Sequence, residues 1–70
     1  MVTLATRLRR LRRERLLTQQ QLSDRAGLGP NEVSRIESGA VKNPRFDTIR
    51  KLAAALDVPP EDLVRGLEEE

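Results

Sequence analysis

The apolar positions of this chain recur at intervals of three and four residues, the spacing of one face of an α-helix. Leu4, Leu8 and Leu11 form the first such set, and four later segments repeat the pattern. No strand, linker or internal repeat is apparent. The pattern therefore predicts an all-α fold of five helices, in a single domain that comprises residues 1–70.

Local residue choices predict where the first two helices begin and end. Thr3 is a reasonable N-cap for the first helix, which is expected to end near Arg15. Thr18 and Gln21 have the spacing of a capping box and open the second helix. Gly27 is expected to end the second helix, because glycine readily adopts the positive φ that a sharp turn between helices requires.

The third helix is predicted to begin at Gly29 and Pro30, since proline is tolerated in a first helical turn. Val33 and Ile36 are expected to point inward, and Gly39 is expected to close the helix. The third helix is thus predicted to span residues 30–39.

Two further helices follow a polar, basic loop at residues 40–45. Pro59 and Pro60 separate them, and Glu61 and Asp62 fall in the first turn of the last helix, where acidic groups favour the positive end of the helix dipole. The apolar face of the fourth helix is predicted to consist of Phe46, Ile49, Leu52, Ala53 and Leu56.

Composition excludes several kinds of site. The chain has no cysteine or histidine, which argues against a disulfide and against a zinc site built on these ligands. It has one phenylalanine and no tyrosine or tryptophan, which argues against a base-stacking platform. Paired carboxylates in apolar surroundings and a glycine-rich phosphate loop are also lacking. We therefore expect no enzyme activity, no metal and no cofactor.

The sequence also predicts a cytoplasmic protein. Its longest apolar stretch, residues 52–56, is far too short to span a bilayer. The first residues lack the charged and apolar regions of a signal peptide. A soluble intracellular location with no membrane contact is the expectation.

Charge is distributed unevenly along the chain. Residues 7–45 hold ten lysines and arginines against four acidic residues, whereas residues 46–70 hold three against seven. A basic front and an acidic back suit a protein that faces a polyanion on one side. The alternative is an ordinary solvated surface in an arginine-rich protein, since arginine outnumbers lysine eleven to two. Charge alone leaves both interpretations open.

Residues 18–39 have the pattern of a helix-turn-helix, two short helices joined by a tight turn. This motif needs a small residue where the helices cross, which Ser23 supplies, and a turn residue, which Gly27 supplies. The apolar residues expected between the helices are Leu22, Val33 and Ile36.

With these features in register, the chain resembles the Cro/C1-type helix-turn-helix family, which includes phage repressors and many small bacterial regulators. The resemblance extends from Leu4 to about Leu67. It implies a lambda-repressor-like fold whose third helix lies in the major groove of double-stranded DNA. The matching positions are Arg12, Thr18, Gln19, Leu22, Gly27, Val33–Gly39, Asn43, Pro44 and Leu52–Leu56 before Val58.

Four positions depart from the family's pattern. Leu16 stands where a glycine usually ends the first helix, so either the turn differs or Leu16 adopts a mildly strained conformation. Ser23 replaces the common alanine, and its hydroxyl needs a partner. Gly29 and Pro59 occupy places where serine or threonine usually caps a helix.

The resemblance implies roles for individual side chains, each of which could otherwise be a solvated surface group. Asparagine suits adenine, arginine suits guanine, and glutamate can accept from cytosine. The expected base contacts are Asn31, Glu32, Ser34 and Arg35. The expected phosphate contacts are Thr18, Gln19, Ser38, Lys42, Asn43 and Arg45, with Arg9 and Arg13 from the first helix. In similar proteins Arg12 and Glu37 form a partly buried bidentate ion pair, which implies a structural role for both.

The function implied is a sequence-specific DNA-binding transcription regulator, most often a repressor, that binds a two-fold operator as a homodimer. The apolar residues available late in the chain are Leu63, Val64 and Leu67. Because some of these are needed in the core, a weak dimer that forms on DNA is expected. The alternative is an antitoxin or an adaptor module of a larger complex. A further alternative is the DNA-binding part of a longer enzyme or of a ligand-sensing repressor. The acidic ending at Glu70, without a linker, favours a complete small protein over that alternative.

Overall fold

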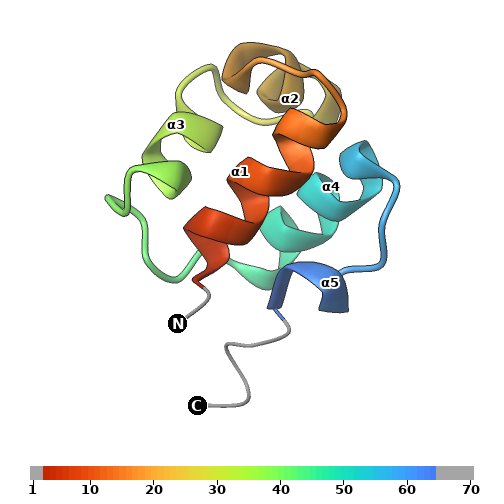
Figure 1. The fold of residues 1–70 in the computed structure, drawn as a ribbon. Coiled ribbons are helices and arrows are strands. Elements are labelled where there is room, and N and C mark those ends of the chain that lie inside the picture. Colours follow the sequence, from red (N-terminus) through yellow and green to blue (C-terminus); the bar gives the residue numbers. More distant parts are fainter. Residues whose placement is uncertain (1–2, 65–70) are drawn as a thin grey trace.

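The computed structural model describes residues 3–64, and these fold into five helices with no strand among them, as predicted. Figure 1 shows α1 crossing the molecule, α2 and α3 at one end, and α4 and α5 behind and below it. Leu67, named above among the apolar residues late in the chain, lies outside the described residues. The helices are α1 (Leu4–Glu14), α2 (Gln19–Ala26), α3 (Glu32–Glu37), α4 (Phe46–Leu56) and α5 (Glu61–Val64).

The predicted ends of α1 and α2 are confirmed. The Thr3 side chain accepts a hydrogen bond from the Thr6 amide at 3.1 Å. The capping box of α2 is complete: the Gln21 amide donates to the Thr18 hydroxyl at 3.0 Å, and the Thr18 amide donates to the Gln21 side chain at 2.9 Å. Gly27 ends α2 with a φ of +71°.

The turn between α1 and α2 contains the strain foreseen at Leu16. This residue has a φ of +56°, a region that costs a non-glycine residue about 1–2 kcal/mol. Its side chain is 89% exposed, whereas the neighbouring Leu17 is buried. Leu16 therefore adopts the backbone conformation that glycine usually takes in such a turn, and its side chain does not contribute to the core.

The predicted bounds of α3, residues 30–39, extend two residues too far at each end. The helix begins at Glu32, with Asn31 at the N-cap position, and it ends at Glu37, before Gly39 at a φ of +87°. The Glu32 amide donates to the Gly29 carbonyl at 3.2 Å, which closes a turn over these residues. Pro30 consequently lies in that turn, because its fixed φ suits a turn as well as a first helical position.

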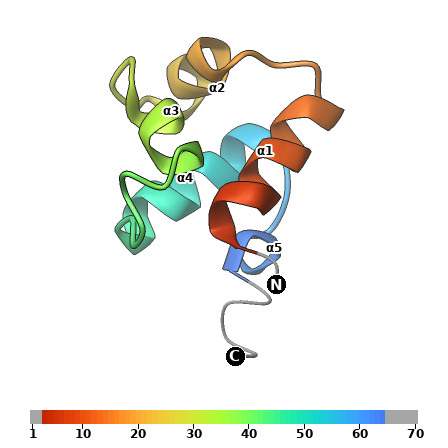
Figure 2. The same cartoon turned by 60° about the vertical axis from the view of Figure 1, so that its left-hand side comes forward.

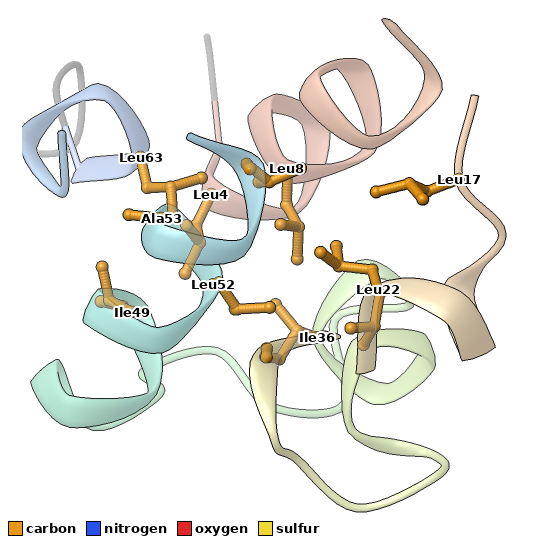
Figure 3. Close-up of a cluster of buried hydrophobic side chains, with 12 residues drawn as sticks. Leu4, Leu8, Leu17, Leu22, Ile36, Ile49, Leu52, Ala53 and Leu63 are labelled. Atoms are coloured by element: carbon orange, nitrogen blue, oxygen red, sulfur yellow. The ribbon is translucent and has the colours of Figure 1, made fainter. Parts of the chain in front are cut away.

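Among residues 3–64, twelve buried apolar residues form one core between the helices. Figure 3 shows Leu63 of α5 beside Leu4 and Ala53, at the opposite end of the core from Leu17 and Leu22. Leu63 is fully buried, so the last helix closes the core over α1 and α4. No helix in the described part is long and apolar enough to cross a membrane.

Phe46 does not join the core, contrary to the prediction. Its side chain is 63% exposed, whereas Ile49, Leu52, Ala53 and Leu56 of the same helix are buried. Helical spacing determines the direction of a side chain but not whether a neighbouring element covers it. Phe46 is the first residue of α4, and no other element of residues 3–64 covers its side chain there.

Candidate nucleic-acid interface

The two helices of the motif cross at Ser23, which is fully buried. Its hydroxyl accepts a hydrogen bond from the Val33 amide at 3.3 Å, so the group has the partner that its burial requires. At the turn that follows α2, the Leu28 amide donates to the Ser23 carbonyl at 2.9 Å. The start of α3 is thus attached to α2 by a side chain as well as by packing.

The outward side of α3 carries four polar side chains. Asn31 and Arg35 are exposed and Glu32 and Ser34 are half-buried, whereas Val33 and Ile36 on the inward side are fully buried. Within residues 3–64, the four polar side chains make no hydrogen bond or ion pair. An unpaired amide and an unpaired guanidinium lie on the same helix face, and both can make the bidentate contacts that read base edges.

The α3–α4 loop continues this polar surface. Lys42, Asn43 and Arg45 are exposed, and their side chains have no partner in the part of the chain that the structure describes. Ser38 differs from them, because its hydroxyl donates to the Arg35 carbonyl at 3.1 Å and accepts from the Ala40 amide at 3.3 Å. Figure 2 shows α3 and this loop along one side of the molecule.

Behind α3, the carboxylate of Glu37 is the centre of a hydrogen-bond cluster. Arg12 donates to both carboxylate oxygens, from Nε at 2.7 Å and from Nη2 at 3.0 Å, and from Nη1 to the Leu17 carbonyl at 2.8 Å. Gln19 donates to the same carboxylate from Nε2 at 3.0 Å. The Glu37 side chain is 1% exposed and that of Arg12 is 12% exposed. This cluster joins α1, α2 and α3.

Arg9 adds a further cation to the Glu37 cluster. Its Nη2 donates to the Glu37 backbone carbonyl at 3.1 Å, and its Nε lies 3.7 Å from the carboxylate. Arg9 and Gln19, which the sequence analysis expects to contact phosphate, both donate hydrogen bonds to Glu37 at the end of α3. Arg13, by contrast, is exposed and makes no ion pair within residues 3–64.

The electrostatics of the cluster favour its ionised form. Burial alone would raise the pKa of Glu37, but the hydrogen bonds from Arg12 and Gln19 and the charges of Arg12 and Arg9 outweigh it. The pKa of Glu37 therefore lies below its ordinary value of 4.5. The hydrogen bond to Glu37 raises the pKa of Arg12 despite its desolvation. Both groups are charged at neutral pH.

Comparison with known proteins identifies the architecture. A family model described as helix-turn-helix matches residues 8–63. This range extends from the second turn of α1 into α5 and includes the whole of α2, α3 and α4. The chain belongs to the Cro/C1-type helix-turn-helix family.

Individual members of the family resemble the chain over most of its length. The HTH-type transcriptional repressor RghR of Bacillus subtilis is 44% identical over 64 residues, which are 91% of this chain and 47% of RghR. The restriction-modification controller protein C.AhdI of Aeromonas hydrophila superposes with a TM-score of 0.81 at 38% identity, covering 86% of this chain and 89% of C.AhdI. This chain therefore spans less than half the length of RghR.

The family also includes a similar fold solved on DNA. The biofilm regulator SinR in complex with DNA superposes with a TM-score of 0.84 at 27% identity. The superposition covers 89% of this chain and 98% of that SinR chain.

Proposed function

We propose that this domain is a sequence-specific, double-stranded DNA-binding transcription regulator that inserts α3 into the major groove. The observation that carries the proposal is the unpaired polar face of α3, attached at its end to α1 and α2 through the Glu37 carboxylate. The SinR complex supports it, since a similar fold was solved there with DNA. RghR is named a repressor, and we propose the same direction of regulation here.

In this proposal the side chains at the start of α3 read the bases. Arg35 pairs with guanine through two guanidinium protons, and Asn31 pairs with adenine through its amide. Ser34 and the half-buried Glu32 contact neighbouring base edges, with Glu32 favouring the amino group of cytosine. These four positions determine sequence preference.

Contacts to the DNA backbone surround α3. Gln19 uses one of its two amide protons on Glu37, so the second is available for a phosphate oxygen. The remaining cationic and polar groups place the domain on the duplex without reading sequence. They are Thr18 at the start of α2, Ser38, Lys42, Asn43 and Arg45 of the α3–α4 loop, and Arg9 and Arg13 of α1.

The regulator is proposed to act as a homodimer on a two-fold operator, because a single module of this size buries limited surface on DNA. It acts without enzymatic activity, and we place it in the cytoplasm. Its half-sites lie one helical turn apart, about 34 Å from centre to centre.

Selection of bound duplexes from a random pool tests the proposal directly. We expect the purified chain to enrich one sequence with two-fold symmetry. The affinity for that site should fall linearly with salt on logarithmic axes, because bound phosphates release counterions. Equal recovery of all duplexes would contradict sequence-specific binding. Capture of a stoichiometric protein partner with no enriched duplex would favour the adaptor or antitoxin alternative.

A further inference from the structure

Two large apolar side chains are exposed in the described part of the chain, Leu16 and Phe46. Leu16 lies in the tight α1–α2 turn, at a φ of +56°. Phe46 is instead the first residue of the regular helix α4. Leu63, one of the three apolar residues that the sequence analysis names late in the chain, is fully buried in the core and is not available for a partner.

The position of Phe46 relates it to the proposed DNA-binding surface. It directly follows Arg45, the last residue of the α3–α4 loop, and so lies beyond the C-terminal end of α3. Figure 2 shows α3 between α2 on one side and this loop with the start of α4 on the other. Two molecules side by side on DNA would meet through one of these two sides.

The exposed side chains of the two sides differ in character. Those of α2 are all polar: Gln20, Gln21, Asp24 and Arg25. The other side presents Phe46, the single aromatic residue of the chain. Burial of apolar surface drives protein association, so the side of Phe46 is the one suited to contact a second protein.

The dimensions of the molecule favour a contact made by protruding side chains. Its Cα atoms extend over 31 × 23 × 21 Å. Half-sites one helical turn apart separate two molecules by about 34 Å. Two such molecules approach closely without overlapping, and a phenylalanine from each can fill the space between them.

The charges around Phe46 complement a second copy of the same surface. Asp47 and Arg50 are exposed beside it, one at the adjacent position and one a helical turn further along. Arg50 has no partner within residues 3–64, and Asp47 has only an exposed contact of 3.5 Å with Lys51. A two-fold axis near Phe46 would place Asp47 of each copy toward Arg50 of the other.

We propose that Phe46 is the centre of a two-fold contact between two copies of this chain bound to adjacent half-sites. The C-terminal end of α3 then faces the symmetry axis, and α2 faces away from it. This inference rests on the proposed function and adds to it the surface through which the two copies bind cooperatively.

The test compares the intact chain with two variants, Phe46→Ala and Leu16→Ala. One duplex carries a single half-site recovered by selection, and a second carries two as an inverted repeat with centres about 34 Å apart. We expect Phe46→Ala to bind the single half-site like the wild type and to lose about tenfold or more of the cooperativity on the repeat. Leu16→Ala, which truncates the other exposed apolar side chain, should change neither.

A charge exchange provides a second test that does not alter the ring. Asp47→Arg and Arg50→Asp should each reduce cooperativity on the repeat, and the double variant should restore it. Cooperativity unchanged by Phe46→Ala, or an equal loss on the single and double sites, would overturn the inference. Half-site binding by the wild type without cooperativity would also overturn it, whereas absence of wild-type binding to both duplexes would contradict the proposed function itself.

Discussion

Gln19, the first residue of α2, donates a hydrogen bond of 3.0 Å to the carboxylate of Glu37, the last residue of α3. The turn at Gly27 connects the other ends of the same two helices. The two helices are therefore joined at both ends, by the turn at Gly27 at one end and by the Gln19–Glu37 hydrogen bond at the other. Since Arg12 holds the same carboxylate, α1 fixes the pair of helices from behind.

Glu37→Gln should strongly destabilise the protein, because it leaves the guanidinium of Arg12 buried without an anion. Breaking a buried ion pair on one side costs about 3–5 kcal/mol, a large part of the 5–15 kcal/mol typical of a domain. Urea unfolding followed by circular dichroism measures the change. Asp47→Asn, which breaks the exposed pair with Lys51, is the matched control and should stay close to the wild type.

Stability should fall with pH through the titration of Glu37. Its folded-state pKa is lower than the ordinary value of 4.5, so the unfolded chain takes up this proton first as the pH falls. The contribution of the ion pair is complete above pH 4.5 and is lost as the pH falls from there through the lower, folded-state value. The difference in unfolding free energy between wild type and Glu37→Gln should shrink across this window. A constant difference would show that Glu37 does not account for the acid sensitivity.

Arg35→Ala and Lys42→Ala should weaken DNA binding in different ways. Loss of Arg35 should cost about 1–3 kcal/mol on the selected site and relax the preference at one base pair, because this residue is proposed to read a base. Loss of Lys42 should weaken binding to all duplexes and reduce the salt slope by about one, because it is proposed to contact phosphate. Affinities for the selected site and for single-base variants, measured over a range of salt, separate the two. Identical effects on every duplex would contradict the role given to α3.

Leu16→Gly should stabilise the protein. Glycine removes the conformational cost of a φ of +56°, about 1–2 kcal/mol. Roughly half of this gain in unfolding free energy is lost again, because glycine increases the conformational freedom of the unfolded chain. A rise of a few °C in the midpoint of thermal unfolding is expected. Leu16→Ala keeps the positive φ and should show no such gain, which distinguishes backbone strain from loss of the exposed side chain.

The sequence predicts a helix end correctly where that end depends on residues a few positions apart along the chain. Thr18 and Gln21 are three residues apart, and their mutual hydrogen bonds follow from that spacing alone. Pro30 is ambiguous, because its fixed φ fits both a turn and a first helical turn, and the sequence therefore predicts a start for α3 that is two residues too early.

Features that depend on tertiary contact could not be predicted from spacing. Phe46 shares the helical pattern of the core residues, yet its side chain is exposed and no element within residues 3–64 covers it. Gln19 and Glu37 are 18 residues apart and belong to different helices, so no periodic rule relates them. The resemblance to a family suggested the pairing of Glu37 with Arg12, but the contributions of Gln19 and Arg9 emerged only from the folded arrangement.

The hydroxyl of Ser23 has a consequence for the residue that begins α3. An asparagine at the N-cap position, as Asn31 is, commonly accepts a hydrogen bond with its side chain from a free backbone amide in the first turn of its own helix. Here Ser23 accepts the hydrogen bond from the Val33 amide, and the Asn31 side chain makes no capping bond. Asn31 is therefore not needed to cap α3. Under the proposed function, its replacement by another amino acid could change the preferred DNA sequence while α3 keeps its hydrogen bond to Ser23 of α2.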